Sequence, residues 1–239
     1  MMFSSKLRLR DKQPEIMDQP GLETAPHVKA LRGLARINWI SGSDRILWHS
    51  ICGLAKEKPG QQLRVLDIAT GSGDVPIRLQ RRARRAGLPL TFAGADLSDT
   101  AIALARENAE HARESVDFFT LDALRGSLPE DYDVLMCSLF LHHLEAAEAV
   151  NLLRRMSQAS RSMVLVNDLI RSQVGYLLAY LGTRLLTTSS MVHYDGPQSV
   201  RGAFKMAEAW VLATLAGVTD ATISWRWPFR FLLEWRRQP

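Results

Sequence analysis

Seven short apolar stretches recur along the chain, and residues with helical spacing fill most of the intervals between them. The apolar stretches predict strands at 65–68, 90–97, 116–121, 132–141, 162–168, 221–227 and 229–235. Helical spacing predicts helices at 27–58, 75–86, 98–113, 145–157, 169–188 and 199–216. Strands that alternate with helices favour a mostly parallel sheet with helices on both faces. We therefore predict an α/β, Rossmann-like fold that ends in a strand hairpin around Pro228.

The first 26 residues differ from the rest of the chain. They are polar, are interrupted by Pro14, Pro20 and Pro26, and show no periodic pattern, so we predict an arm with little regular structure. The remaining residues, 27–239, contain no internal repeat. Apolar residues make up 46% of the 239-residue chain, which suffices for one large core, and we predict a single domain there.

A glycine turn joins the first predicted strand to the helix after it, in the sequence VLDIATGSGDVP at 65–76. Gly71 and Gly73 allow a ligand to approach the backbone closely. The third glycine of the dinucleotide fingerprint is missing, and Asp67 at the end of the strand would repel a pyrophosphate. A carboxylate in this position attracts the ammonium group of an amino acid. S-adenosylmethionine carries such a group and no phosphate, so the turn favours this cofactor over NAD.

Polar residues stand at the ends of further predicted strands. Asp96 ends the second strand, 25 residues after Gly71, near the offset at which an acidic residue meets ribose hydroxyls. Asp122 follows the third strand, and the segment from Ser138 to His142 ends the fourth. Ligands of open α/β sheets bind outside these carboxyl ends, so we predict the site there.

This constellation resembles the class I S-adenosylmethionine-dependent methyltransferases. A further, looser likeness covers about fifteen residues, LARINWISGSDRILW, ahead of the glycine turn. It is similar to the lead-in helices of the ubiquinone and menaquinone biosynthesis methyltransferases, and the matching residues are Asn38, Ser41, Gly42 and Trp48.

The resemblance implies roles for several parts of the chain. Helices at 27–58 would cap the cofactor and acceptor, an apolar insertion at 169–198 would form a lid, and Asp122 would face the adenine amino group. The implied cofactor residues are Asp67, Ala69, Gly71, Gly73, Asp96, Leu97, Asp122, Ala123 and Ser138. The residues expected to contact the acceptor are Asn38, Tyr176, Tyr180 and Tyr194.

Transfer of a methyl group to oxygen or to an acidic carbon also requires that a proton be removed. Candidate bases are His142 and His143 after the fourth strand, and His193 and Asp195 in a polar segment, HYDGP, that predicts a turn after the helix of the lid. His193 is favoured because this turn would place it beside the acceptor. Ordinary packing or turn roles are alternatives for the histidines.

The function predicted from these features is methyl transfer from S-adenosylmethionine to an apolar small molecule of phenolic, quinol-like or polyketide-like type. The arginines at 81–85 fall mostly opposite the apolar face of their helix, which favours a solvated helix face. With the formal net charge of +5 they also leave RNA methylation or contact with an anionic membrane surface open. A cofactor-binding protein without catalytic activity is a third interpretation. Cys52 and Cys137 lie far apart and show no metal-binding spacing, so we expect no metal and a reducing cytoplasm. The longest apolar run is too short to cross a bilayer.

Overall fold

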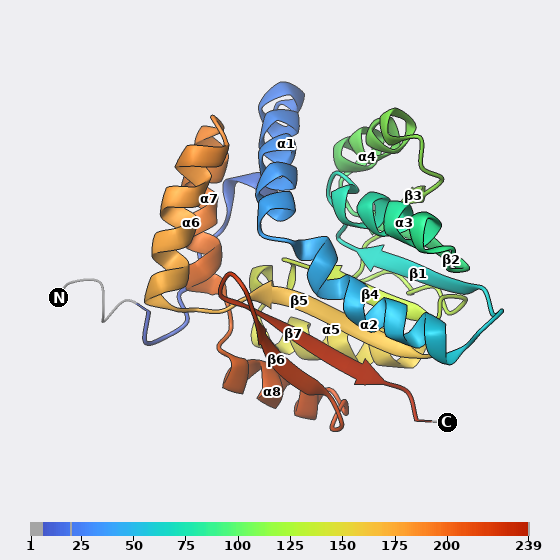
Figure 1. Ribbon diagram of the computed structural model, residues 1–239. Coiled ribbons are helices and arrows are strands. Elements are labelled where there is room, and N and C mark those ends of the chain that lie inside the picture. The colour runs from blue at the N-terminus through green and yellow to red at the C-terminus, as the bar shows by residue number, and fades with distance from the viewer. Residues whose placement is uncertain (1–6, 20, 239) are drawn as a thin grey trace.

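A seven-stranded sheet forms the centre of the protein in the computed structural model, which describes residues 7–19 and 21–238 (Figure 1). In spatial order the strands are β3 (Asp117–Thr120), β2 (Leu90–Asp96), β1 (Leu63–Ile68), β4 (Val134–Ser138), β5 (Met163–Leu169), β7 (Arg230–Arg236) and β6 (Thr222–Arg226). The first five are mutually parallel, and β7 runs antiparallel to both of its neighbours. The seven predicted strands and the C-terminal hairpin are thereby confirmed.

Eight α-helices and two short 3-10 helices accompany the sheet in the described part of the chain. They are η1 (Ile16–Asp18), α1 (Thr24–Ile40), α2 (Ser43–Glu57), α3 (Asp74–Ala86), α4 (Asp99–Ala112), η2 (Leu141–His143), α5 (Ala146–Ala159), α6 (Gln173–Leu186), α7 (Ser190–Gly202) and α8 (Met206–Leu215). The predicted helix over 27–58 is two helices, because Gly42 adopts a left-handed conformation with φ of 71° between α1 and α2.

Alternate residues of the strands pack on two helical layers. On one face, residues such as Leu66 and Leu135 pack with α5 and α8. On the other face, Val65, Met136 and their neighbours pack with α2 and α3. The central strands are buried on both faces, which explains their continuous apolar sequences. Helices α1, α6 and α7 lie together beyond the carboxyl ends of the strands (Figure 1).

The predicted turn at 193–197 and the predicted helix start at Ser199 are wrong, because both lie inside α7. Pro197 reads as a turn signal in sequence. Here Gly196 before it has no side chain, and a Cβ there would lie 2.4 Å from Thr183 Cγ2 of α6. The close approach of the two helices therefore stabilises a helical segment that local propensity disfavours.

The described part of the arm contains η1 and the first residues of α1, and it packs on the domain. Arg10 Nη2 donates to the carbonyl oxygens of His142 and Leu144, at 3.0 and 2.6 Å. Asp195, inside α7, accepts hydrogen bonds from the backbone N–H groups of Ile16 and Met17, at 2.8 and 3.1 Å. Asp195 of the segment HYDGP thus anchors the arm.

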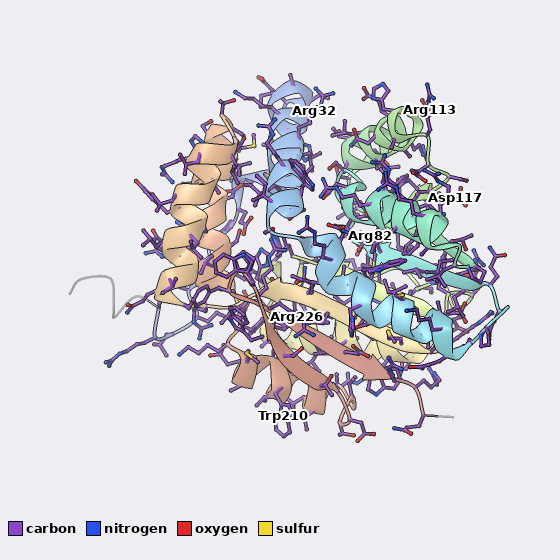
Figure 2. All side chains as sticks on the ribbon, viewed as in Figure 1. Arg32, Arg82, Arg113, Asp117, Trp210 and Arg226 are labelled. Carbon is purple, nitrogen blue, oxygen red and sulfur yellow. The ribbon has the colours of Figure 1, made fainter. Side chains whose placement is uncertain are left out.

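The arginines that end α3 are mostly paired within the molecule. Figure 2 shows Arg82 beside α2, where its Nε donates to Asp44 Oδ2 at 2.7 Å. Arg81 and Arg84 both pair with the carboxylate of Glu114, at 3.1 and 3.0 Å. These pairs favour the interpretation of a solvated helix face. In residues 7–19 and 21–238, no helix combines the length and apolar character needed to cross a membrane.

Candidate active site

A cavity of about 750 Å³ lies between the carboxyl ends of the strands and helices α1, α6 and α7. Most of the predicted site residues line it, although they come from segments spread over a hundred residues. They are Asn38, Asp67, Ala69, Gly71, Asp96, Leu97, Asp122, Ala123, Ser138, His142 and His143. The structure therefore brings together the strand-end residues that the sequence analysis singled out.

Five of the predicted site residues do not line the cavity, namely Gly73, Tyr176, Tyr180, His193 and Tyr194. Gly73 has a φ of 72°, and a Cβ there would lie 2.5 Å from Phe118 Cζ, so this glycine shapes and packs the turn. His193 Nε2 lies 2.8 Å from the carbonyl oxygen of Thr187. That hydrogen bond holds its ring against the α6–α7 connection.

The tyrosines of the predicted lid lie outside the cavity because α6 turns its small residues inward. Tyr180 and Tyr194 are 40% and 49% exposed. Arg184 stacks over the Tyr180 ring at 3.6 Å, and Arg201 lies 5.9 Å from the Tyr176 ring centre. The α6 residues that line the cavity are Gly175, Leu178, Ala179, Gly182 and Thr183.

Asp67 is a buried carboxylate with one oxygen unused. Its Oδ2 accepts a hydrogen bond from Thr70 Oγ1 at 2.8 Å, whereas its Oδ1 is buried without a partner. Burial, reinforced by the charges of Asp74 and Asp96, raises the pKa of Asp67 to about 8, although the Thr70 hydrogen bond acts in the opposite direction. A cationic ligand group in the cavity would satisfy this oxygen.

Asp74, directly after the glycine turn, repeats this pattern. Burial raises its pKa to about 6, and Arg78 and the Asn38 side chain partly offset the effect. Its Oδ2 is buried and has no hydrogen-bond partner. Two neighbouring carboxylates therefore favour a positive charge at this end of the cavity.

Asp96 connects the end of β2 to the glycine turn. Its Oδ2 accepts from the backbone N–H of Gly71 at 2.8 Å, and its Oδ1 accepts from that of Ser98 at 2.9 Å. A carboxylate has further lone pairs, so both oxygens can still accept hydrogen bonds from a ligand. Asp122 closes its own turn by accepting from the backbone N–H groups of Leu124 and Arg125.

We expect Asp96→Ala to weaken the binding of S-adenosylhomocysteine by on the order of 3 kcal/mol, about a hundredfold. The variant removes a charged acceptor from the cavity and frees the glycine turn. Calorimetry on the folded protein measures the effect, with Asp99→Ala as the control because Asp99 starts α4 outside the cavity lining. An unchanged dissociation constant for Asp96→Ala would exclude this carboxylate from the binding site.

A histidine–aspartate pair stands on the other side of the cavity. His142 Nδ1 lies 2.6 Å from Asp168 Oδ1, and the His142 backbone N–H donates to Asp168 Oδ2 at 3.1 Å. Burial raises the pKa of Asp168, but the His142 ring and the Leu169 backbone N–H outweigh it, so this pKa lies below its usual range. An ionised Asp168 accepts a hydrogen bond from the Nδ1–H group of His142. In the neutral ring Nε2 then carries no proton and is the basic nitrogen.

Glu15 brings the arm to the same histidines. Its Oε1 lies 3.8 Å from His142 Nε2, and its Oε2 lies 4.0 Å from His143 Nε2. Ser199 Oγ donates to Glu15 at 2.7 Å. The three side chains are of types that bind metals, with ligand atoms within 4.8 Å of one another. Sequence spacing predicted no such cluster, because Glu15 is remote in the chain. At 3.8 and 4.0 Å the Glu15 oxygens are too far from the imidazole nitrogens for hydrogen bonds.

Sequence analysis missed several residues of the site, among them Glu15 and Arg230, which line the cavity, and Asp168, which holds the His142 ring. Only Asp168 carried a sequence signal, since it ends a predicted strand as Asp67 and Asp96 do. Nothing in the arm marked Glu15, and Arg230 is one of many arginines in the chain.

The strand order, the antiparallel β7, the glycine turn after β1 and the acidic end of β2 together define a class I S-adenosylmethionine-dependent methyltransferase fold. Residues 65–162 match a family described as "Methyltransferase domain".

The relatives agree with this assignment. The chain is 29% identical over 126 residues to a ubiquinone biosynthesis O-methyltransferase from Thiobacillus denitrificans, covering 52% of this chain and 51% of that protein. It is 37% identical over 76 residues to a demethylmenaquinone methyltransferase from Deinococcus radiodurans, covering 31% and 30%. The chain thus matches about half or less of each relative's length.

A solved structure shares the fold. Magnesium protoporphyrin IX methyltransferase from Synechocystis, with bound S-adenosylhomocysteine, has a TM-score of 0.57 at 18% identity and covers 82% of this chain and 84% of its own. The predicted resemblance to methyltransferases, the predicted fold and S-adenosylmethionine as the cofactor of that class are confirmed.

Proposed function

We propose that this protein transfers the methyl group of S-adenosylmethionine to an oxygen or an acidic carbon of an apolar small molecule, of phenolic, quinol-like or polyketide-like type. The observation that carries the proposal is one cavity that joins three features. The cavity contains the predicted cofactor residues of β1 and β2, the His142 side chain, and apolar side chains of α1 and α6, among them Leu34 and Leu178.

The residues present fit the cofactor. The unpartnered Oδ1 of Asp67 would accept from its ammonium group, and Asp96 would accept from its ribose hydroxyls. Gly71 leaves space at the turn, since a Cβ there would meet only Leu31 Cδ2, at 3.8 Å. When bound, the cofactor supplies an electrophilic methyl group on a positively charged sulfur.

His142 would accept the proton of the acceptor at Nε2. Asp168 fixes the ring through Nδ1, and the carboxylates of Asp168 and Glu15 both stabilise the imidazolium that forms. Helices α1, α6 and α7 would hold an apolar acceptor away from water and in line with the methyl group. Such alignment supplies a large share of the rate enhancement of an enzyme. The names of the two curated relatives support a quinol-like acceptor.

Incubation of the protein with methyl-labelled S-adenosylmethionine and a panel of phenols, quinols and polyketide-like acceptors tests the proposal, with products identified by mass spectrometry. We expect label in at least one apolar acceptor. Label in RNA but in no small molecule would favour RNA methylation instead. Cofactor binding without any transfer, tested also with cell extract as the source of acceptors, would favour a non-catalytic binding protein.

A further inference from the structure

Arg230 is a buried cation at the edge of the cavity. It is the first residue of β7 and lies opposite Leu169 of β5, so it stands at the edge of the sheet where the parallel strands end. Only 2% of the residue is exposed, and it belongs to the cavity lining. A buried arginine normally has a carboxylate partner, because an unpaired charge is costly to bury.

The neighbours of Arg230 do not neutralise it. Its Nη2 donates to Ser41 Oγ at 2.7 Å and its Nη1 donates to Ser43 Oγ, whereas its Nε is buried without a partner. Within residues 7–19 and 21–238, no carboxylate forms an ion pair with it. Burial lowers the pKa of Arg230 to about 10, against the more distant charges of Asp168 and Asp74. The site therefore favours an anion from the cavity.

Side-chain hydrogen bonds lead from Arg230 to the glycine turn. Ser43, which holds Nη1, also donates to Asn38 Oδ1 at 3.5 Å. The Asn38 side chain in turn hydrogen-bonds Asp74, the residue that follows the glycine turn. Asp67 keeps one buried carboxylate oxygen without a partner, and Asp74 Oδ2 has no hydrogen bond but lies 3.9 Å from Arg78 Nη1. The hydrogen bonds thus connect Arg230 to a carboxylate beside the glycine turn.

We propose that Arg230, held by Ser41 and Ser43, binds the carboxylate of the amino-acid part of the cofactor. This proposal rests on the cofactor assigned under the proposed function. An α-amino acid carries its ammonium and carboxylate on one carbon, so it requires neighbouring sites of opposite charge. Asp67 and Arg230 supply these two sites. The guanidinium fork can donate two parallel hydrogen bonds to a carboxylate, which a lysine cannot reproduce.

The network also argues against an anionic acceptor as the partner of Arg230. The hydroxyl groups that orient the guanidinium connect it to Asn38 and Asp74 beside the glycine turn, and in the described part of the chain Arg230 forms no side-chain hydrogen bond with His142 or Asp168.

Three ligands separate the contributions of the carboxylate and of the whole amino acid to the binding affinity. They are S-adenosylhomocysteine, its decarboxylated analogue, and 5′-methylthioadenosine, which lacks the whole amino acid. Calorimetry gives their dissociation constants for the wild type and for Arg230→Met. We expect the wild type to bind S-adenosylhomocysteine about ten- to a hundredfold more tightly than the decarboxylated analogue. In Arg230→Met this difference should vanish, while the affinity for 5′-methylthioadenosine stays within about twofold of wild type.

Arg226→Met is the matched control. Arg226 pairs with Arg230 across the hairpin, lies outside the cavity lining, and donates to the Trp225 carbonyl oxygen; its place on β6 is visible in Figure 2. Arg230→Lys tests whether a positive charge alone suffices to bind the carboxylate. We expect this variant to keep only part of the wild-type difference in affinity between S-adenosylhomocysteine and its decarboxylated analogue. Circular dichroism verifies folding of each variant.

Equal wild-type affinity for S-adenosylhomocysteine and its decarboxylated analogue would overturn the proposal, as would an unchanged difference in folded Arg230→Met. Either result leaves the proposed methyl transfer intact. Failure of the wild type to bind any of the three adenosine ligands would instead contradict the proposed function itself.

Discussion

Replacement of His142 by alanine should lower the rate of methyl transfer by at least about a hundredfold, because general-base catalysis contributes on that order. The affinity for S-adenosylhomocysteine should stay within about twofold of wild type, since His142 is proposed to contact the acceptor and not the cofactor. Single-turnover kinetics with an acceptor from the panel measure the first quantity, and calorimetry measures the second.

The variant Asp168→Asn tests whether Asp168 orients the His142 ring for catalysis or only stabilises the fold. An amide in place of the carboxylate can donate to Nδ1, which would leave the proton on Nε2 and so remove the basic nitrogen from the cavity. We therefore expect a loss of rate similar to that of His142→Ala together with an altered pH–rate profile. A merely structural role would lower the amount of folded protein without changing that profile.

His193→Ala is the informative control for this pair. The sequence analysis favoured His193 as the base, whereas its hydrogen bond to Thr187 and its position outside the cavity lining favour near-wild-type turnover. His143→Ala tests the neighbouring ring, 4.3 Å from that of His142. Wild-type rates in His142→Ala with a large loss in His193→Ala would reverse our assignment.

The strands and the cofactor side of the cavity could be predicted because their signals are local. A short, mostly apolar stretch with an acidic residue at or near its end can be read directly from the sequence, as at Asp67 and Asp96. The parallel sheet then brings these strand ends to one edge without further information. This explains why residues 67, 71 and 96 line one cavity although they lie on different strands and loops.

The acceptor side could not be predicted in the same way, because tertiary contacts override its local signals. Large apolar residues in α6 suggested an inward face, yet Gly175 and Gly182 face inward and Leu181 is 47% exposed. The segment around Pro197 is helical because α6 and α7 pack closely. Glu15 reaches His142 only through folding of the arm over 127 intervening positions, a contact that no spacing rule encodes.

The raised pKa of Asp67 makes both the stability of the fold and the binding of a cation depend on pH. Its pKa is about 8 in the folded protein, against an ordinary value of 3.8. Between these values the folded protein binds more protons than the unfolded chain, so the contribution of Asp67 to stability falls as the pH rises from about 4 to about 8. Asp74, with a pKa of about 6, acts in the same direction over the lower part of this window.

Binding of a ligand ammonium requires the ionised form of Asp67. We therefore expect the affinity for S-adenosylhomocysteine to rise between pH 6 and pH 8, by at most about tenfold per pH unit, with release of about one proton on binding near pH 7. Asp67→Asn should bind the ligand weakly and with little pH dependence. The same variant should unfold at a higher temperature than the wild type at pH 8 without ligand, because it removes an unpaired buried charge while keeping an acceptor for Thr70 Oγ1.

Calorimetry in buffers of different ionisation enthalpy measures the proton release, and thermal unfolding at several pH values measures the stability. Asp133→Asn is a suitable control, since Asp133 is also buried but lies at the opposite edge of the sheet, where its Oδ2 accepts from the Arg64 backbone N–H. A pH-independent affinity in the wild type would contradict the assignment of Asp67 to the ammonium. An undiminished pH dependence in Asp67→Asn would transfer the role to Asp74, whose carboxylate also lines the cavity with an unpartnered oxygen.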